Sequence, residues 1–305
     1  MSTAREKFLA FRRTLGRTPT LHRQTVRARG GTFAVFSTPP VEGSTPLACV
    51  NGGMLHDHTL LWPALAPLAH GRQVILYDQR GRGESPSADD HEAHHIEDDA
   101  ADLAAIRRAL GLRQWDLLGH SWGGGIAMLG ASLDPAGTRR LVLVDAVGTT
   151  NGWMAPLRDA ALARLQGDAH SRLARFTDEV LSDPDPAVHA AQALAIYPAW
   201  FADPDYARVF SPPRAASPTG AAVLAYLRRS GYDWRERVRS LPVPTLVIHG
   251  EADPLPPQVA EDTAALLPDA RLALVPHAGH MPFWEQPGQF FPLVEQFLTP
   301  AHLAR

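Results

Sequence analysis

The sequence predicts an α/β fold: a mostly parallel, twisted sheet with helices on both faces and a helical cap inserted between two strands. Short runs rich in aliphatic and β-branched residues alternate along the chain with longer segments of helical periodicity. Strands connected through helices form parallel sheets. The chain has 305 residues, 45% of them hydrophobic and 20% charged, so it is long enough to bury a large core.

The sheet is expected to begin with a hairpin over residues 24–37, because a glycine pair, Gly30-Gly31, separates two apolar runs there. Further buried strands, each bounded by Gly, Pro, Asp or Asn, are expected over residues 47–50, 73–77, 115–118, 140–144, 245–249 and 271–275. Apolar residues at three- and four-residue spacing predict helices over residues 96–110, 122–133 and 285–298. A short basic helix packed on the domain is expected in the first twenty residues.

The alternation of strands and helices stops between about Gly148 and Leu241. This stretch is rich in alanine, is interrupted by several prolines and contains no strand-like run. We therefore predict a core domain made of residues 1–147 and 242–305, with residues 148–241 as the helical cap. The cap is expected to lie over the carboxyl edge of the sheet, where open α/β sheets bind ligands.

Composition excludes several classes of function. The chain has 29 Lys plus Arg and 32 Asp plus Glu, a net charge of −3, so it lacks the basic field that a nucleic-acid partner requires. No run of 18 apolar residues is present, so we expect no membrane partner. The single cysteine, Cys49, excludes an intramolecular disulfide and is compatible with a cytoplasmic location; we interpret it as a small buried hydrophobe. The oligomeric state stays open.

The strongest chemical signal is the segment Gly119-His120-Ser121-Trp122-Gly123, which directly follows a predicted strand and directly precedes a predicted helix. This is the G-x-S-x-G pattern in the context that it requires. A serine at the tip of such a tight turn has a strained backbone, and side chains two residues away on either side would collide. The pattern predicts that Ser121 is a nucleophile.

A serine hydroxyl needs a histidine base and a carboxylate that orients the histidine. In the order Ser, Asp, His that this fold uses, the candidates are Asp253 and His280, each in a loop after a predicted buried strand. Glu251 and Asp145 are the rival acids, and His277 is the rival base. Both loops leave the carboxyl ends of strands, the edge to which Ser121 also belongs.

Two backbone amides are expected to form an oxyanion hole. One is the amide of Trp122, directly after the nucleophile, and the other is the amide of Gly53 in the loop that follows residues 47–50. His56, Trp122 and Phe283 lie next to these elements in the sequence and are candidate substrate-binding residues. Asp89-Asp90-His91, with His94 and His95, does not match the spacing of a closed zinc site, so we predict no metal.

These residues resemble the α/β-hydrolase superfamily, and within it the proline iminopeptidase-like group. The segment 78–85 resembles that group's D-Q-R-G-x-G-x-S, residues 119–124 resemble its G-x-S-W-G-G, and residues 279–287 resemble its terminal histidine segment. The oxyanion loop departs from the group's H-G-G-P-G, since this chain has Asn51-Gly52-Gly53-Met54-Leu55. The resemblance also implies cap carboxylates that hold a substrate ammonium, for which the candidates are Asp178, Glu179, Asp203 and Asp205.

The expected function is that of a cofactor-independent serine hydrolase that cleaves a small-molecule amide or ester through an acyl-enzyme, as the proline iminopeptidase-like group does. The alternatives are a carboxylesterase or lactonase, then a carbon–carbon bond hydrolase. A further alternative, from another class, is a non-catalytic receptor that uses the pocket only to bind a small molecule. An aspartate-nucleophile dehalogenase or epoxide hydrolase is disfavoured, because Ser121 occupies the nucleophile position.

Overall fold

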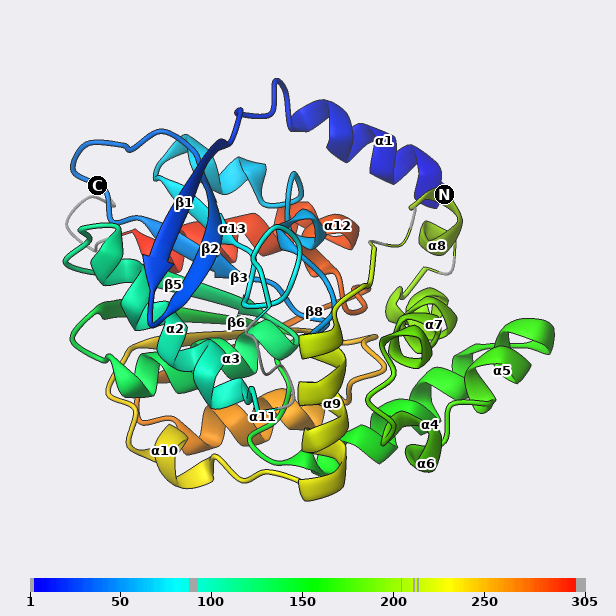
Figure 1. The fold of residues 1–305 in the computed structure, drawn as a ribbon. Coiled ribbons are helices and arrows are strands. Elements are labelled where there is room, and N and C mark those ends of the chain that lie inside the picture. The colour runs from blue at the N-terminus through cyan, green and yellow to red at the C-terminus, as the bar shows by residue number, and fades with distance from the viewer. Residues whose placement is uncertain (1–2, 88–92, 204, 211, 213, 300–305) are drawn as a thin grey trace.

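The computed structural model describes residues 3–299 except 88–92, 204, 211 and 213. Its centre is an eight-stranded sheet in the order β1-β2-β4-β3-β5-β6-β7-β8 (Figure 1). The strands are β1 (His22–Ala28), β2 (Gly31–Ser37), β3 (Leu47–Val50), β4 (Val74–Tyr77), β5 (Trp115–His120), β6 (Thr138–Val144), β7 (Thr245–Gly250) and β8 (Ala270–Val275). Every strand expected from the sequence is present, to within a few residues.

The sheet is mostly parallel, as predicted. The hairpin β1–β2 is antiparallel, with Ala28 opposite Gly31, and β2 also pairs antiparallel with β4. From β4 to β8 all neighbouring strands are parallel. The carboxyl ends of β3 and β5 to β8 therefore meet at one edge of the sheet, and the predicted site residues follow those ends.

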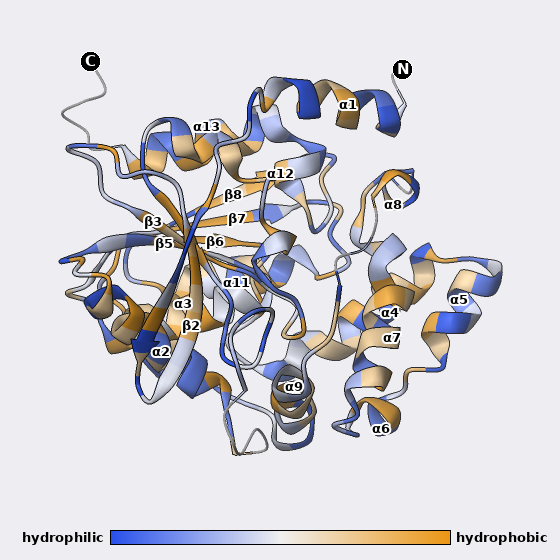
Figure 2. Cartoon of the chain, turned by 45° about the horizontal axis from the view of Figure 1, so that its top comes forward, coloured by the Kyte–Doolittle hydropathy of each residue, from blue (hydrophilic) through white to orange (hydrophobic). Residues whose placement is uncertain are grey.

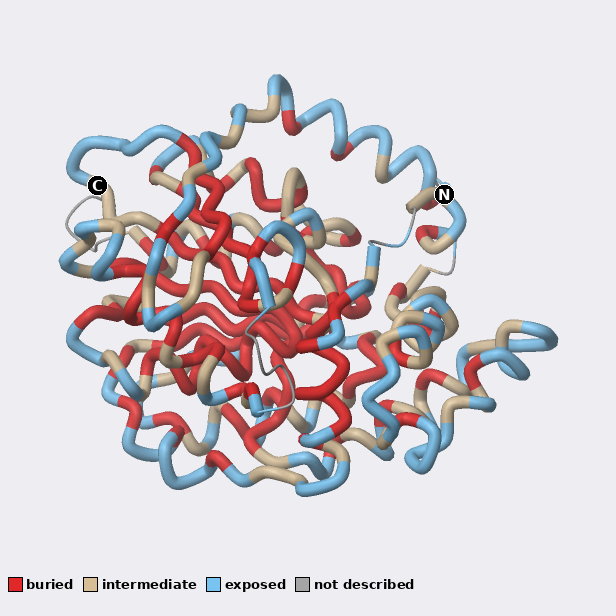
Figure 3. The backbone as a smooth tube through the Cα atoms, in the orientation of Figure 1, coloured by how far each residue is buried: buried red, intermediate tan, exposed pale blue. Residues whose placement is uncertain are grey.

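Each of the central strands is buried on both faces (Figure 3). Successive side chains of a strand point to opposite faces. Accordingly, Leu117 belongs to one apolar cluster and Leu118 to another, and Val142 and Leu143 are divided in the same way. This arrangement explains why these strands are continuous apolar runs rather than alternating ones.

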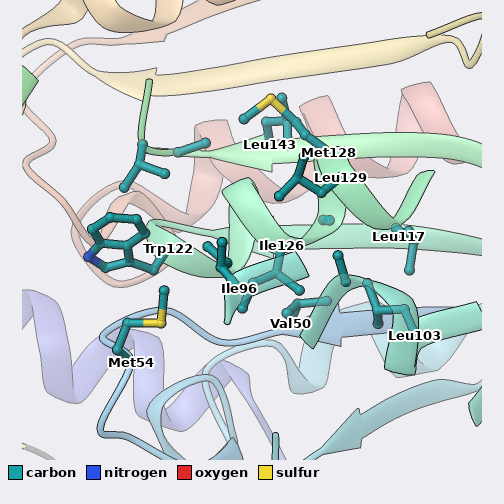
Figure 4. Close-up of a cluster of buried hydrophobic side chains, with 14 of the residues drawn as sticks. Val50, Met54, Ile96, Leu103, Leu117, Trp122, Ile126, Met128, Leu129 and Leu143 are labelled. Atoms are coloured by element: carbon teal, nitrogen blue, oxygen red, sulfur yellow. The ribbon is translucent and has the colours of Figure 1, made fainter. Parts of the chain in front are cut away.

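Helices cover both faces of the sheet, as Figure 2 shows from the side. On one face lie α2 (Ile96–Ala109), α3 (Trp122–Leu133) and α11 (Pro257–Leu266); on the other lie α12 (Pro282–Glu285) and α13 (Pro287–Leu298). In Figure 4, Ile126 and Leu129 of α3 pack with Leu103 of α2 and Val50 of β3. The whole of α3 is apolar or glycine up to Ala131, which lets it pack closely against the strands.

The predicted helix over residues 285–298 differs in one respect. The structure has two helices, α12 and α13, separated at Gln286. Gln286 has φ −134° and ψ 55°, which is not helical. The residue before a proline is pushed out of the helical region by a clash with the proline ring, and Pro287 follows directly, so the chain restarts there.

Between β6 and β7 the described chain is helical, with one isolated bridge between Thr150 and Asp233. The helices are α4 (Met154–Arg164), α5 (Gly167–Ala174), α6 (Asp178–Leu181), α7 (Pro186–Ile196), α8 (Tyr206–Val209), α9 (Pro218–Ser230) and α10 (Arg235–Arg239). Of these, α10 packs against α3 and α11 on the face of the sheet. The division into core and cap at residues 148 and 241 stays a prediction.

The N-terminal helix α1 (Ala4–Thr14) packs on the domain. Phe8 contacts Phe210 and Trp284, and Phe11 contacts Trp284 and Phe291. These two aromatic side chains of α1 are thus used in packing. No helix among the described residues is long and apolar enough to span a membrane.

The turn between β5 and α3 depends on two glycines. A Cβ on Gly119 would overlap the backbone of Gly123, and a Cβ on Gly123 would overlap the carbonyl oxygens of Val50 and Asn51. These neighbours are backbone atoms of a buried sheet and cannot move away cheaply. The sequence pattern G-x-S-x-G is therefore a steric requirement of this turn.

Gly123→Ala should lower the free energy of unfolding by about 1–3 kcal/mol, because it overpacks a rigid site. Gly288→Ala is the matched control. Gly288 is exposed in α13, and a Cβ there meets nothing within 4 Å, so the change should be less than about 0.5 kcal/mol. Urea unfolding of both variants measures the difference, and equal stabilities would contradict the packing argument.

Candidate active site

Ser121 lies at the sharp turn between β5 and α3 with φ 54° and ψ −122°. A positive φ is uncommon for a residue other than glycine, and such strain persists only where the surroundings impose it. Here the Ser121 N–H donates to the Val144 carbonyl at 3.0 Å, and the Ser121 carbonyl accepts from Gly124 at 2.9 Å and Val147 at 3.2 Å. These bonds hold the hydroxyl at the N-terminus of α3, where the helix dipole favours negative charge.

The structure brings His280 and Asp253 together. His280 Nδ1 lies 2.7 Å from Asp253 Oδ2, and both residues are buried. Asp253 Oδ1 also accepts from the Leu255 N–H at 2.9 Å. The rival base His277 follows β8 directly with φ 60° and makes no such contact with Asp253.

Asp145, the rival acid, lies beside this pair. It directly follows β6, its Oδ1 accepts from the Gly250 N–H at 2.8 Å, and the charge of the neighbouring Asp253 acts on it. Burial raises the pKa of both carboxyls, and the Asp253 charge raises the pKa of Asp145 further. Two carboxyls this close cannot both ionise in a buried site.

We assign the shared proton to Asp145. Asp253 accepts hydrogen bonds from two groups, Leu255 N–H and His280 Nδ1, which favours its ionised form, whereas Asp145 Oδ2 is buried and has no hydrogen-bond partner among the described residues. A proton on Asp145 can be donated to Asp253, and this bond lowers the pKa of Asp253. Asp145 then positions Asp253 rather than replacing it.

His280 is enclosed by protein on several sides. The backbone N–H of His280 donates to the Trp200 carbonyl at 2.7 Å, and its backbone carbonyl contacts His120 Nε2 at 2.8 Å. The Trp200 ring stacks on the His280 imidazole at 4.1 Å between centroids. Burial lowers the pKa of His280 to about 3. The neutral imidazole is the form that can accept a proton from a hydroxyl.

Ser121 Oγ has no hydrogen-bond partner among the described residues, so the Ser121–His280 contact is open in this structure. Both residues nevertheless line the same pocket. Such contacts often tighten only when substrate is bound. Ser121 and His280 therefore border one cavity.

Gly53 lies at the wall of the same pocket with φ 71°. A loop in this left-handed conformation can turn an amide toward a ligand, and glycine adopts it without strain. Two polar side chains of the segment 78–85 hydrogen-bond to the backbone of this loop. Gln79 Nε2 donates to the Asn51 carbonyl at 2.8 Å, and Arg82 Nε donates to the Met54 carbonyl at 2.8 Å.

Arg82 is itself fixed by a buried ion pair. Its two terminal nitrogens each lie 3.0 Å from an oxygen of Asp99, and neither side chain is exposed. Asp99 comes from the first turn of α2. The motif that resembles the proline iminopeptidase-like group thus supports the oxyanion loop structurally.

The pocket is mostly apolar, and its empty volume is about 970 Å³ including its open mouth. Among the residues predicted from the sequence, His56 and Trp122 line it. Phe283 is not among the described lining residues; it is buried and packs edge-on against His120 at 5.4 Å between centroids. His56 Nδ1 also contacts the Arg214 carbonyl at 3.0 Å, which links the oxyanion loop to the segment before α9.

The proposed amine-binding carboxylates are not placed at the pocket. Asp178, Glu179, Asp203 and Asp205 are absent from its described lining, and the described lining contains no Asp or Glu. Sequence reasoning also missed most of the other lining residues, among them Trp200, His189 and Arg228. These three come from helices of the insertion, where the sequence has no motif to distinguish pocket residues from surface residues.

Among the described residues, two groups bring potential metal-ligand atoms within 4.8 Å of one another, Asp57-His58-Asp78 and Asp145-His249-Asp253. Protein groups already bind the central carboxylates: Asp78 accepts from His58 N, His58 Nδ1 and Glu84 N, and Asp253 accepts as described above. We therefore propose no metal site. Of the other histidine and acid cluster, Asp89-Asp90-His91 lies outside the described residues, and His94 Nε2 contacts Asp99 at 2.9 Å. Cys49 is buried in the core.

This fold and this arrangement of residues define a hydrolase, and comparison with known families agrees. The family model described as the alpha/beta hydrolase fold matches residues 46–287. The chain therefore belongs to the α/β-hydrolase family.

Its relatives include proline iminopeptidases. The chain is 29% identical over 266 residues to a proline iminopeptidase of Lactiplantibacillus plantarum, covering 79% of this chain and 88% of that protein. Among solved structures, proline iminopeptidase of Mycobacterium smegmatis superposes with a TM-score of 0.70 at 23% identity, covering 91% and 97% of the chains. Naproxen esterase of Bacillus subtilis superposes with a TM-score of 0.66 at 17% identity, covering 98% of this chain and 99% of that chain. These two structural likenesses show the fold alone.

Asp253→Asn should lower kcat by about 10³- to 10⁴-fold, because the amide cannot stabilise the imidazolium or fix the ring tautomer. Asp145→Asn keeps an N–H that can donate to Asp253 and should change kcat less than about threefold. Steady-state kinetics on one chromogenic ester compares the two variants. A severe loss in Asp145→Asn with a mild one in Asp253→Asn would assign the acid to Asp145 instead.

Proposed function

We propose that the chain is a serine hydrolase in which Ser121, His280 and Asp253 act as a catalytic triad. The observation that carries the proposal is that Ser121, strained at the elbow, shares one pocket with an imidazole bonded to a buried carboxylate. A strained serine in this position has no structural benefit of its own, whereas a nucleophile needs access to the pocket, which Ser121 lines.

The reaction proceeds in two halves. His280 removes the Ser121 proton as Ser121 Oγ attacks the substrate carbonyl, and the amides of Gly53 and Trp122 bind the oxyanion. The tetrahedral intermediate collapses when His280 gives its proton to the leaving nitrogen or oxygen, which releases the amine or alcohol and leaves an acyl-enzyme. Water, deprotonated by His280, then attacks the acyl carbonyl and frees the carboxylic acid and Ser121.

The substrate is a small-molecule amide or ester. The largely enclosed apolar pocket supports a small ligand rather than an extended polymer. The relationship to proline iminopeptidases favours amide cleavage. The absence of Asp and Glu from the described pocket lining favours a carboxylester or lactone instead, because a desolvated ammonium needs a carboxylate partner.

Ser121→Ala should lower kcat/KM at least about 10³-fold on whichever substrate the wild type cleaves, since no acyl-enzyme can form. Rates on prolyl 4-nitroanilide, 4-nitrophenyl butyrate and a simple lactone identify that substrate, and thermal unfolding serves as the folding control. Retained turnover in a folded Ser121→Ala variant would overturn the proposal. No turnover of any ester, amide or lactone by the wild type would favour the receptor.

A further inference from the structure

The end of the pocket formed by the insertion carries a cation. Arg228, in the last turns of α9, lines the pocket together with His189 and Gln192 of α7. Its side chain is 16% exposed. An arginine keeps its charge at any physiological pH, so this end of an otherwise apolar pocket has a fixed positive charge.

The protein leaves much of this guanidinium unsatisfied. Arg228 Nε is buried and has no hydrogen-bond partner among the described residues. The only carboxylate paired with it there is Asp178, at 3.6 Å from Nη1, and the Asp178 side chain is 81% exposed. An ion pair with one solvated member contributes little to the stability of the fold, and a buried donor without a partner lowers that stability.

The neighbouring groups do not neutralise the charge. Arg158 is close enough to oppose it, since the Arg158 charge, like burial, lowers the pKa of Arg228. His189 Nε2 contacts the Asp183 carbonyl at 2.8 Å, and burial and the Arg228 charge both lower the pKa of His189. His189 is therefore neutral, and Arg228 is the only permanently charged residue among the described residues that line the pocket.

We propose that Arg228 is the anion-binding residue of the pocket, and that the preferred substrates are esters or amides that carry a carboxylate away from the scissile bond. The planar guanidinium matches a carboxylate with two parallel hydrogen bonds. This inference rests on the proposed function and names its substrate class.

The test uses two esters that differ in one charge, 4-nitrophenyl hydrogen adipate and its methyl ester. Arg228→Met, which keeps an unbranched apolar stem and removes the guanidinium, should lower kcat/KM for the acid about 10- to 100-fold, the loss of a charge-assisted hydrogen bond. The same variant should lower kcat/KM for the methyl ester less than about threefold. Arg228→Lys should recover part of the preference for the acid, because it keeps the charge without the fork.

Arg229→Met is the matched control. Arg229 is exposed on the same helix, donates to the Ser182 carbonyl and does not line the pocket. It should leave the ratio of the two rates at the wild-type value. Equal losses of kcat/KM on both esters in Arg228→Met would assign Arg228 a structural role. Unchanged kcat/KM on both esters would remove Arg228 from substrate recognition. Either result overturns the inference.

A binding measurement separates this inference from the proposed function. Calorimetry with monomethyl adipate compares Ser121→Ala with Ser121→Ala/Arg228→Met, neither of which needs to turn over. The second variant should bind at least about tenfold more weakly. If wild type cleaves neither ester while this difference is found, the proposed function fails and the anion site stands. If wild type cleaves the methyl ester and the difference is absent, only the anion site fails.

Discussion

The turn that carries Ser121 is the constraint on which the rest of the site depends. A positive φ at a residue with a side chain is tolerated only because β5 and α3 approach within the space that Gly119 and Gly123 leave free. This close approach puts the hydroxyl at the N-terminus of α3 and at the carboxyl edge of the sheet. The loops after β3, β7 and β8 begin at the same edge of the sheet, so short loops are enough to bring Gly53, Asp253 and His280 to the edge where Ser121 lies.

Electrostatics divides the pocket into two parts. Around Ser121 the titratable groups are held neutral or paired: burial lowers the pKa of His280, and Asp145 and Asp253 share a proton in our assignment. This region is suited to proton transfer, since little charge must be neutralised before reaction. The end formed by α7 and α9 is different, because Arg228 is a fixed charge that has no buried counter-ion in the part of the chain that the structure describes. In our proposals, the region around Ser121 carries out the chemistry, and the end with Arg228 selects the substrate.

The sequence predicted the sheet well because each buried strand is an apolar run bounded by turn residues, and it predicted the elbow because sterics permit few residue types there. It favoured Asp253 over the rival acids Asp145 and Glu251 from their order along the chain, and the contact between His280 Nδ1 and Asp253 Oδ2 supports that choice. Phe283 was proposed from its nearness to His280 in the chain, yet its side chain points into the core cluster beside His120. Arg228 carried no motif, and only the packing of α9 against α7 reveals its place.

The most direct test of the account is covalent labelling with an organofluorophosphonate, followed by intact mass and peptide mapping. An activated serine attacks the phosphorus and fluoride leaves, so the wild type should gain one adduct per chain, located on Ser121. The Ser121→Ala variant should gain none. A wild-type chain that stays unlabelled at concentrations that modify known serine hydrolases, or that carries the adduct on another residue, would contradict the assignment of Ser121 as nucleophile.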